Sequence, residues 1–315
     1  MVFIYLEDLK CHTKIIRYFN YMKISYTTNL RDQFDTILVG QLNKKTMKLI
    51  NQYQGKKIIF LTYGLETKII ECYKENNKKN KVIKNQLEQF ISQCNLVIVS
   101  EESIKKILTK GTKRKIVVIP YELPIINISN ARKDIYLKYN LSKRRKKILV
   151  IDYRYEYLNE LYLISNIYSK YDFLYLGYKP QYLMKNKEIE VLSSLPSNVI
   201  FIPYHDLNVF SDLCKICNLV INFNDKELNI EYFYTILLLK KQLLQKKSIL
   251  YEQLIDNKNC YIFDDEDELR LKLKKIMESR VANLSDEGYE LIKKYNFENI
   301  AKTFNMYLNQ VEKIN

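Results

Sequence analysis

The stretch KKIIFLTYG (56–64) decides the fold class, because a continuous apolar run stands there between two turn signals. Three further runs have the same character, namely DTILVG (35–40), NLVIVS (95–100) and KIVVIPYELP (115–124). Segments with helical spacing of apolar residues separate them. Short continuous Val/Ile runs are typical of strands that are buried on both faces of a parallel sheet. The first half of the chain therefore predicts a doubly wound α/β domain.

The sequence before and between these runs completes the expected domain. VFIYLE (2–7) predicts a first strand and TKIIRYFNYMK (13–23) predicts a helix. Asn43 is placed to cap a second helix and Gly55 to end it, while Gly64 is expected to open the turn after the third strand. We expect this domain to cover residues 1–126.

The second half repeats the pattern after a segment without strand character. Residues 127–147 end in a basic run and are expected to form a linker. We expect a second domain over 148–296, a C-terminal helix over 297–315, and helical structure throughout 264–313. The expected strands are KILVID (147–152), DFLYLGY (172–178) with Gly177 at its end, SNVIFIPY (197–204), NLVINF (218–223) and NCYIF (259–263).

Charge is distributed unevenly over the 315 residues, whose net charge is +15. Residues 1–147 hold 30 basic and 12 acidic side chains, a net charge of +18, whereas residues 148–315 have a net charge of −3. The excess indicates an anionic partner for the first half, with a lysine-rich solvated surface as the alternative explanation. No nucleic-acid-binding module is recognisable, so we expect no nucleic acid as partner.

The hydropathy, cysteines and glycines of the sequence limit the possible functions further. No apolar run is long enough to span a bilayer, and the N-terminus does not resemble a signal peptide, so we expect a cytoplasmic protein. The six cysteines include a C-x-x-C pair, Cys214 and Cys217, which we expect to be reduced core residues rather than a metal site. With six glycines and no glycine-rich loop, a diphosphate would have to meet helix N-termini and basic side chains.

These segments resemble family 4 GT-B glycosyltransferases over nearly the whole chain. The likeness is carried by VFIYLED (2–8), KISYTTNLRDQFDTILVG (23–40), CNLVIVSEESIKKIL (94–108), NLVINFNDKE (218–227) and KQLLQKKSILYEQLIDNKNCYIF (241–263). It is greatest to bacterial glycolipid synthases that add a second hexose to a monoglycosyl-diacylglycerol. The resemblance implies two Rossmann-like domains facing across a cleft and a C-terminal helical tail.

The same resemblance implies a chemistry. It is the retaining transfer of a hexose from a nucleotide sugar, such as a UDP-hexose, to a lipid-linked acceptor, without a metal, by a peripheral protein at the inner face of the membrane. Residues are carried over by position. Glu227 matches the Glu that contacts the transferred sugar, Tyr63 stands where related enzymes have a His, and Glu66 keeps a nearby acidic position. The donor-side positions are Arg154, Gly177, His205, Thr235 and Glu252.

Several positions depart from the family pattern. The second Glu of the donor motif falls on Thr235, and the expected basic pair falls on Tyr157 and Leu158, with Arg154 as the substitute. The helix start that should carry small residues reads ILLLKKQ (236–242). The alternative hypothesis, a catalytically degenerate protein that acts as a partner subunit or a membrane-surface module, therefore stays open.

The basic segment SIKKILTKGTKRK (103–115) is the expected membrane contact. Ile104, Ile107 and Leu108 share one helical face, and lysines surround it. Such a helix can lie in a membrane interface, with each basic residue near the surface contributing about 1 kcal/mol. Alternatively, the apolar face packs on the sheet and only surface attraction remains. The basic residues are Lys105, Lys106, Lys110, Lys113, Arg114 and Lys115.

Overall fold

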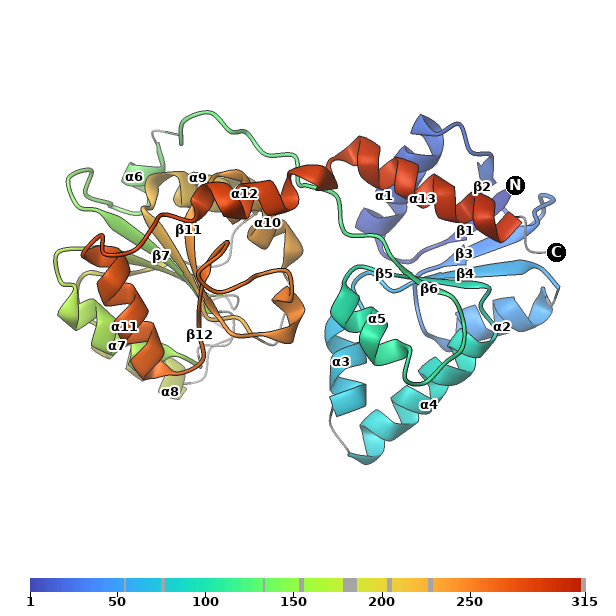
Figure 1. Ribbon diagram of the computed structural model, residues 1–315, viewed down its shortest axis with the longest axis horizontal. Coiled ribbons are helices and arrows are strands. Elements are labelled where there is room, and N and C mark those ends of the chain that lie inside the picture. The colour runs from blue at the N-terminus through green and yellow to red at the C-terminus, as the bar shows by residue number, and fades with distance from the viewer. Residues whose placement is uncertain are drawn as a thin grey trace. The chain divides into compact units, whose positions relative to one another are not determined.

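Two six-stranded parallel sheets, each flanked by helices, make up the protein (Figure 1). The structure is a computed structural model that describes residues 1–53, 55–74, 77–132, 134–152, 156–177, 186–202, 206–225 and 229–312, without the side chains of 186–188, 191 and 312. The chain divides into unit 1, made of Met1–Glu122 with Tyr295–Asn315, and unit 2, made of Leu123–Lys294. Each unit is described by itself.

The sheet of unit 1 has the strand order β2-β1-β3-β4-β5-β6. All four residues of β3 and of β5 are buried, as expected for strands covered on both faces. The sequence predicted each of these strands except β2, which is only two residues long. The strands are β1 (Val2–Tyr5), β2 (Tyr26–Thr27), β3 (Thr36–Val39), β4 (Lys57–Leu61), β5 (Leu96–Val99) and β6 (Ile116–Val118).

Helices cover both faces of this sheet. One face carries α1 and α13, and the other carries α2 to α5 (Figure 1). As the sequence predicted, Asn43 caps α2 by accepting a hydrogen bond from the backbone N–H of Thr46. Gly55 follows the end of α2 and Gly64 follows β4, and both adopt positive φ. The helices are α1 (Leu9–Tyr21), α2 (Lys44–Gln52), α3 (Glu66–Lys74), α4 (Lys78–Ser92), α5 (Glu102–Leu108) and α13 (Phe297–Glu312).

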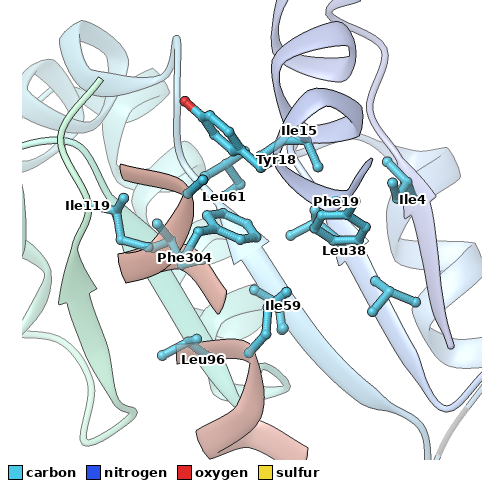
Figure 2. Close-up of a cluster of buried hydrophobic side chains, with 14 of the residues drawn as sticks. Ile4, Ile15, Tyr18, Phe19, Leu38, Ile59, Leu61, Leu96, Ile119 and Phe304 are labelled. Atoms are coloured by element: carbon cyan, nitrogen blue, oxygen red, sulfur yellow. The ribbon is translucent and has the colours of Figure 1, made fainter. Parts of the chain in front are cut away.

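Helix α13 belongs to the core of unit 1, although unit 2 separates it in sequence from the rest of that unit. Phe304 is completely buried, and its ring centroid lies 6.0 Å from those of both Tyr18 and Phe19 on α1. Figure 2 shows Phe304 among side chains of β4, β5 and α1. Burying an aromatic ring of this size contributes several kcal/mol to the stability of the unit.

The sheet of unit 2 has the strand order β12-β11-β10-β7-β8-β9. Residues of α7, α11, β7 and β10 share one hydrophobic cluster, and α10 contacts both α9 and α12. The strand β11 was not predicted, because its sequence QLLQK has polar residues at both ends. The strands are β7 (Lys147–Ile151), β8 (Asp172–Leu176), β9 (Val199–Ile202), β10 (Leu219–Asn222), β11 (Gln242–Lys246) and β12 (Tyr261–Phe263).

The helices of unit 2 differ from the expectation in two places. Residues 278–284 are not helical, so the prediction of continuous helix over 264–313 was wrong. Residues 236–242, expected to start a helix, instead contain the end of α10 and the start of β11. The helices are α6 (Asp134–Lys138), α7 (Leu158–Ile167), α8 (Asn186–Ser194), α9 (Leu207–Ile216), α10 (Ile230–Leu238), η2 (Ile249–Tyr251), α11 (Glu266–Met277), α12 (Ser285–Ile292) and, where the units meet in sequence, η3 (Lys293–Tyr295).

The segment between the two sheets is part of unit 2. It contains α6, and Arg132 Nε lies 2.5 Å from Oδ2 of the buried Asp212 on α9. Because this basic segment falls in unit 2, unit 1 has 24 basic and 13 acidic residues and unit 2 has 27 and 23, net charges of +11 and +4. Unit 1 is still the more basic of the two. Within the described residues, no helix is long and apolar enough to cross a membrane.

Candidate active site

A buried carboxylate lies at the carboxyl edge of the unit 1 sheet. Glu66 begins α3 just after β4 and is only 5% exposed. Its Oε1 accepts hydrogen bonds from Ser100 Oγ at 2.6 Å and Tyr121 Oη at 2.9 Å. Burial raises the pKa of Glu66, and the two hydroxyls partly offset that rise. A carboxyl group with a raised pKa beside hydroxyl donors is suited to binding and orienting another hydroxyl.

Tyr63 and Tyr121 fix the loops around this carboxylate. The Tyr63 hydroxyl donates to the carbonyl oxygen of Ile119 at 2.6 Å, and the two tyrosine rings lie 4.4 Å apart. Tyr121 Oη also accepts from the backbone N–H of Gly64 at 2.9 Å. The structure therefore brings the predicted Tyr63 and Glu66 together through Tyr121, a residue that sequence reasoning missed. Tyr63 is 8% exposed, and its hydroxyl is already engaged in the hydrogen bond to the backbone carbonyl of Ile119.

A second buried carboxylate lies beyond β6. Glu122 is 6% exposed and its Oε1 accepts from Arg17 Nη1 at 3.2 Å. Its Oε2 has no hydrogen-bond partner among the described residues, and the same is true of the buried Thr62 Oγ1 and Ser103 Oγ. Buried polar atoms in native proteins nearly always have a protein or water partner. The edge of the unit 1 sheet therefore retains hydrogen-bonding capacity for water or for a ligand.

In unit 2, the buried Asp152, directly after β7, accepts hydrogen bonds from the backbone just before α7. It is 1% exposed, and its Oδ2 accepts from the Tyr157 backbone N–H and from Tyr175 Oη, both at 3.0 Å. Its Oδ1 accepts from the Glu156 backbone N–H at 3.4 Å. These bonds satisfy amides just before α7, in the way that a capping side chain does. They fix the position of Tyr157.

Tyr157 occupies one of the positions where the resemblance placed a basic pair. Its ring stacks on Phe223 with centroids 4.8 Å apart, and its hydroxyl lies 3.4 Å from Asp225 Oδ2. Lys246, at the end of β11, places its Nζ 5.7 Å from the same ring centroid. A cation is thus present at this edge, but it comes from another strand. Sequence reasoning missed Lys246 because no motif points to it.

Buried amides hold the neighbouring strand ends in place. Asn222 Nδ2 donates to Gln245 Oε1 at 2.8 Å, and Gln245 Nε2 donates to the carbonyl oxygen of Asn224 at 3.0 Å. Ser248 Oγ donates to the carbonyl oxygen of Asp225 at 2.6 Å. Residues 224 and 225, which follow β10, are therefore fixed by the side chains of Gln245 and Ser248.

The predicted donor residues divide into two groups. Arg154, His205 and Glu227 lie outside the described residues. Gly177 directly follows β8 and is buried, as expected from the sequence, and its backbone N–H donates to Ile202 O at 3.4 Å. Thr235 is completely buried within α10, where its hydroxyl donates to the carbonyl oxygen of Glu231 at 2.7 Å, and Glu252 is exposed directly after η2.

The expected membrane helix packs its apolar face inward. Ile104 and Leu108 are completely buried, so α5 has no free apolar face formed by these residues for insertion. Lys106, Lys110, Lys113, Arg114 and Lys115 are exposed, and Lys105 is half-buried. Several of these side chains have partners within unit 1: Lys105 pairs with Glu102, Arg114 donates to Ser92 O and Lys115 donates to Gln310. The basic side chains of this segment can therefore attract an anionic surface, but its buried apolar residues cannot insert into a membrane.

The described residues contain no cluster of three or more His, Cys, Asp or Glu arranged to hold a metal ion. The cysteines are free thiols, and Cys214 and Cys217 are buried in unit 2, as predicted for this pair. Burial raises the pKa of Cys217 to about 12, so this thiol stays protonated at neutral pH.

Solved structures with the same fold are glycosyltransferases of the GT-B class. Sucrose-phosphate synthase from Thermosynechococcus elongatus gives a TM-score of 0.69 at 13% identity, covering 90% of this chain and 75% of that one. The pneumococcal O-GlcNAc transferase GtfA, solved with UDP and GlcNAc, gives 0.64 at 12% identity, over 88% of this chain and 57% of that one. Trehalose-6-phosphate synthase OtsA gives 0.60 at 11% identity, over 97% and 76%.

These similarities confirm the predicted GT-B fold. No protein-family model matches the sequence, and no curated protein sequence matches it significantly. The chain spans little more than half the length of GtfA.

Proposed function

We propose that the protein is a glycosyltransferase that moves a hexose from a nucleotide sugar to a lipid-linked or glycolipid acceptor. The GT-B fold is the observation that carries this proposal, because the solved structures that share it include sugar synthases and a transferase crystallised with UDP. A UDP-hexose is the proposed donor. The likeness to family 4 glycolipid synthases supports the retaining reaction and the lipid-linked acceptor.

Hexose transfer requires that the leaving diphosphate be stabilised and that the acceptor hydroxyl be held close to the anomeric carbon. We assign the diphosphate to Arg154 and to Lys246, the cation that lies beside Tyr157. Glu227 is proposed to bind the hydroxyls of the transferred sugar. Gly177, His205 and Glu252 stay proposed donor contacts, whereas the internal hydrogen bond of Thr235 gives no support to its ribose contact.

On the acceptor side, Glu66 is the proposed hydroxyl-binding group. Its two hydroxyl donors hold the carboxylate in place, and its raised pKa makes it a better proton acceptor than an exposed Glu. Tyr63 contributes by positioning, since its hydroxyl bonds to Ile119 O. No metal is required in this scheme.

A peripheral position at the cytoplasmic face of the membrane is part of the same proposal. The net charge of +11 on unit 1 supports attraction to anionic lipids. The basic side chains of residues 106–115 are exposed on unit 1 and are proposed to contribute surface attraction rather than insertion.

A second candidate is a degenerate GT-B protein that serves as a partner subunit, and one observation favours it. The N-terminus of α10 is capped, because Asn229 Oδ1 accepts from the Tyr232 backbone N–H at 3.1 Å, and the Tyr232 ring stacks on Phe210 of α9 with ring centroids 3.8 Å apart. A diphosphate would have to compete for that amide. A solved complex, GtfA/B, also has this fold, with a TM-score of 0.62.

Nucleotide binding distinguishes the two candidates. We expect UDP, UDP-sugars or GDP-sugars, each at a concentration of about 100 times its Kd, to raise the free energy of unfolding of an active enzyme by about 2.7 kcal/mol. For a unit of this size that corresponds to a rise of roughly 5–10 °C in Tm. Lys246→Met should weaken binding about tenfold or more, while its exposed neighbour provides the matched control Lys247→Met. EDTA should change neither binding nor transfer. Absence of any shift with every nucleotide would favour the partner subunit.

A further inference from the structure

An open groove of about 710 Å³ runs between α2 and α4 on unit 1. Both helices cover the same face of the sheet, opposite α1 and α13 (Figure 1). The groove is separate from the carboxyl-edge residues described above, none of which lines it. Its lining residues are Leu42, Asn43, Lys44, Met47, Lys48, Asn51, Gln86 and Gln89.

The groove is apolar at its base and polar at its rim. Leu42 and Met47 are half-buried and form the base, whereas Lys44 and Lys48 are exposed on the rim. The remaining rim residues are amides, which donate and accept hydrogen bonds without adding charge. A ligand that fits this lining has an apolar part of some length and a polar head.

The rim is cationic. Lys44 and Lys48 stand one helical turn apart on α2, a spacing at which two like charges destabilise a helix by a few tenths of a kcal/mol. Within the described part of the chain, neither ammonium group has an ion-pair partner. None of the described acidic residues lines the groove, although the Glu7 carboxylate accepts from Asn43 Nδ2 at 3.2 Å at one end of it. An anion between the two lysines would relieve their repulsion.

We propose that this groove binds one molecule of an anionic phospholipid. The phosphate lies between Lys44 and Lys48, and an acyl chain lies along Leu42 and Met47. The volume far exceeds that of a free phosphate ion, and the apolar base would otherwise face water. A single-stranded nucleic acid is disfavoured because, among the residues that the structure describes, no aromatic side chain lines the groove for base stacking.

This inference adds a defined lipid site to the proposed attachment of unit 1 to a membrane surface. It does not depend on sugar transfer, because its test uses no nucleotide. It also differs from the general attraction assigned to residues 106–115, because here lysines and apolar side chains act on the same molecule.

The test is a titration of the full chain with soluble, short-chain lipids below their micelle concentration, followed by calorimetry. Dihexanoyl-phosphatidylglycerol has both a net negative charge and acyl chains. Dihexanoyl-phosphatidylcholine lacks the net charge, and glycerol 3-phosphate lacks the acyl chains. We expect the first to bind at least tenfold more tightly than either of the others. Hydrogen exchange of the complex should slow in 42–52 and 86–92.

Matched variants locate the site. Lys44→Gln with Lys48→Gln should weaken phosphatidylglycerol binding about 30-fold, at about 1 kcal/mol for each lysine. Lys78→Gln with Lys79→Gln removes the same charge from exposed positions of α4 that do not line the groove, and should change binding less than threefold. Glu7→Gln should tighten binding, since it removes the nearby carboxylate. Thermal unfolding of each variant verifies that it is folded.

Three results would overturn the proposal. Equal losses in the two double variants would mean that only overall charge matters. Equal binding of glycerol 3-phosphate would mean that the rim binds phosphate and the apolar base has no role. Tighter binding of an acidic amphipathic peptide than of phosphatidylglycerol would assign the groove to a protein helix instead.

Discussion

Replacing Phe304 tests whether α13 is a structural part of unit 1. The side chain is completely buried and lies 6.0 Å, between ring centroids, from Tyr18 and from Phe19. Truncating a buried Phe to Ala costs about 3–5 kcal/mol, which combines lost burial with the cavity that remains. At about 1.4 kcal/mol for each factor of ten, the opening equilibrium of unit 1 should rise by roughly two to four orders of magnitude.

Hydrogen exchange read separately in each unit measures this effect. In Phe304→Ala, the slowest amides of β4 and β5 should lose protection, while those of β7 and β10 in unit 2 should keep it. Phe304→Leu retains part of the apolar volume and should fall between the wild type and Ala. Met306→Ala is the matched control, since Met306 is on the same helix but 46% exposed, and should cost less than about 0.5 kcal/mol.

The reasoning fails if Phe304→Ala and Met306→Ala have the same effect, because burial would then not decide the cost. It also fails if β7 and β10 lose as much protection as β4 and β5. That result would mean that α13 stabilises the chain as a whole rather than unit 1.

Two further predictions concern buried charges. Burial raises the pKa of Glu66 above its usual 4.5, so the folded state holds this proton more tightly and its contribution to stability falls as pH rises from 4.5 through the raised value. Urea unfolding of the wild type and Glu66→Gln at pH 4–8 should show that slope in the wild type only, and parallel profiles would contradict it. For Asp212, burial would raise the pKa, but Arg132 and Lys215 together lower it, so its contribution is present above pH 3.8 and is lost as pH falls through the lowered value. Arg132→Gln should lower the free energy of unfolding, because it leaves the buried Asp212 with Lys215 as its remaining cationic partner among the described residues, and zero coupling in a double-mutant cycle with Asp212→Asn would show that the pair is not stabilising.

Strands buried on both faces were the most predictable part of the fold. The runs that became β3, β4 and β5 consist almost wholly of Val, Ile, Leu and Phe, which indicate strands without any tertiary information. Strand β11 escaped prediction because Gln245 is buried by pairing with Asn222, a contact that the sequence pattern does not show. The assignment of α13 to unit 1 was equally hidden, since an amphipathic helix does not indicate which sheet it covers.

Residues of the candidate site were predictable only where the neighbouring sequence indicates their place in the fold. Tyr63 and Glu66 follow a strong strand, and the structure brings them together through Tyr121. Tyr121 and Lys246 were missed because each contacts residues that are distant in sequence: Tyr121, after β6, contacts Glu66, and Lys246, on β11, lies by Tyr157. The apolar face of 103–115 shows the opposite case: its periodicity is the same whether it meets lipid or a sheet, and only the structure shows that Ile104 and Leu108 are buried.

The division of unit 1 into two sequence segments has a consequence during synthesis. At about 5–20 residues per second, roughly 10–35 s pass between translation of residue 122 and translation of α13. Unit 2 ends at Lys294, just before α13, so the strands of unit 1, which the ribosome makes first, wait for their last helix while nearly all of unit 2 is made. Until α13 arrives, the sheet surface that receives Phe304 is exposed, which makes the nascent chain a natural client for chaperones (Figure 2).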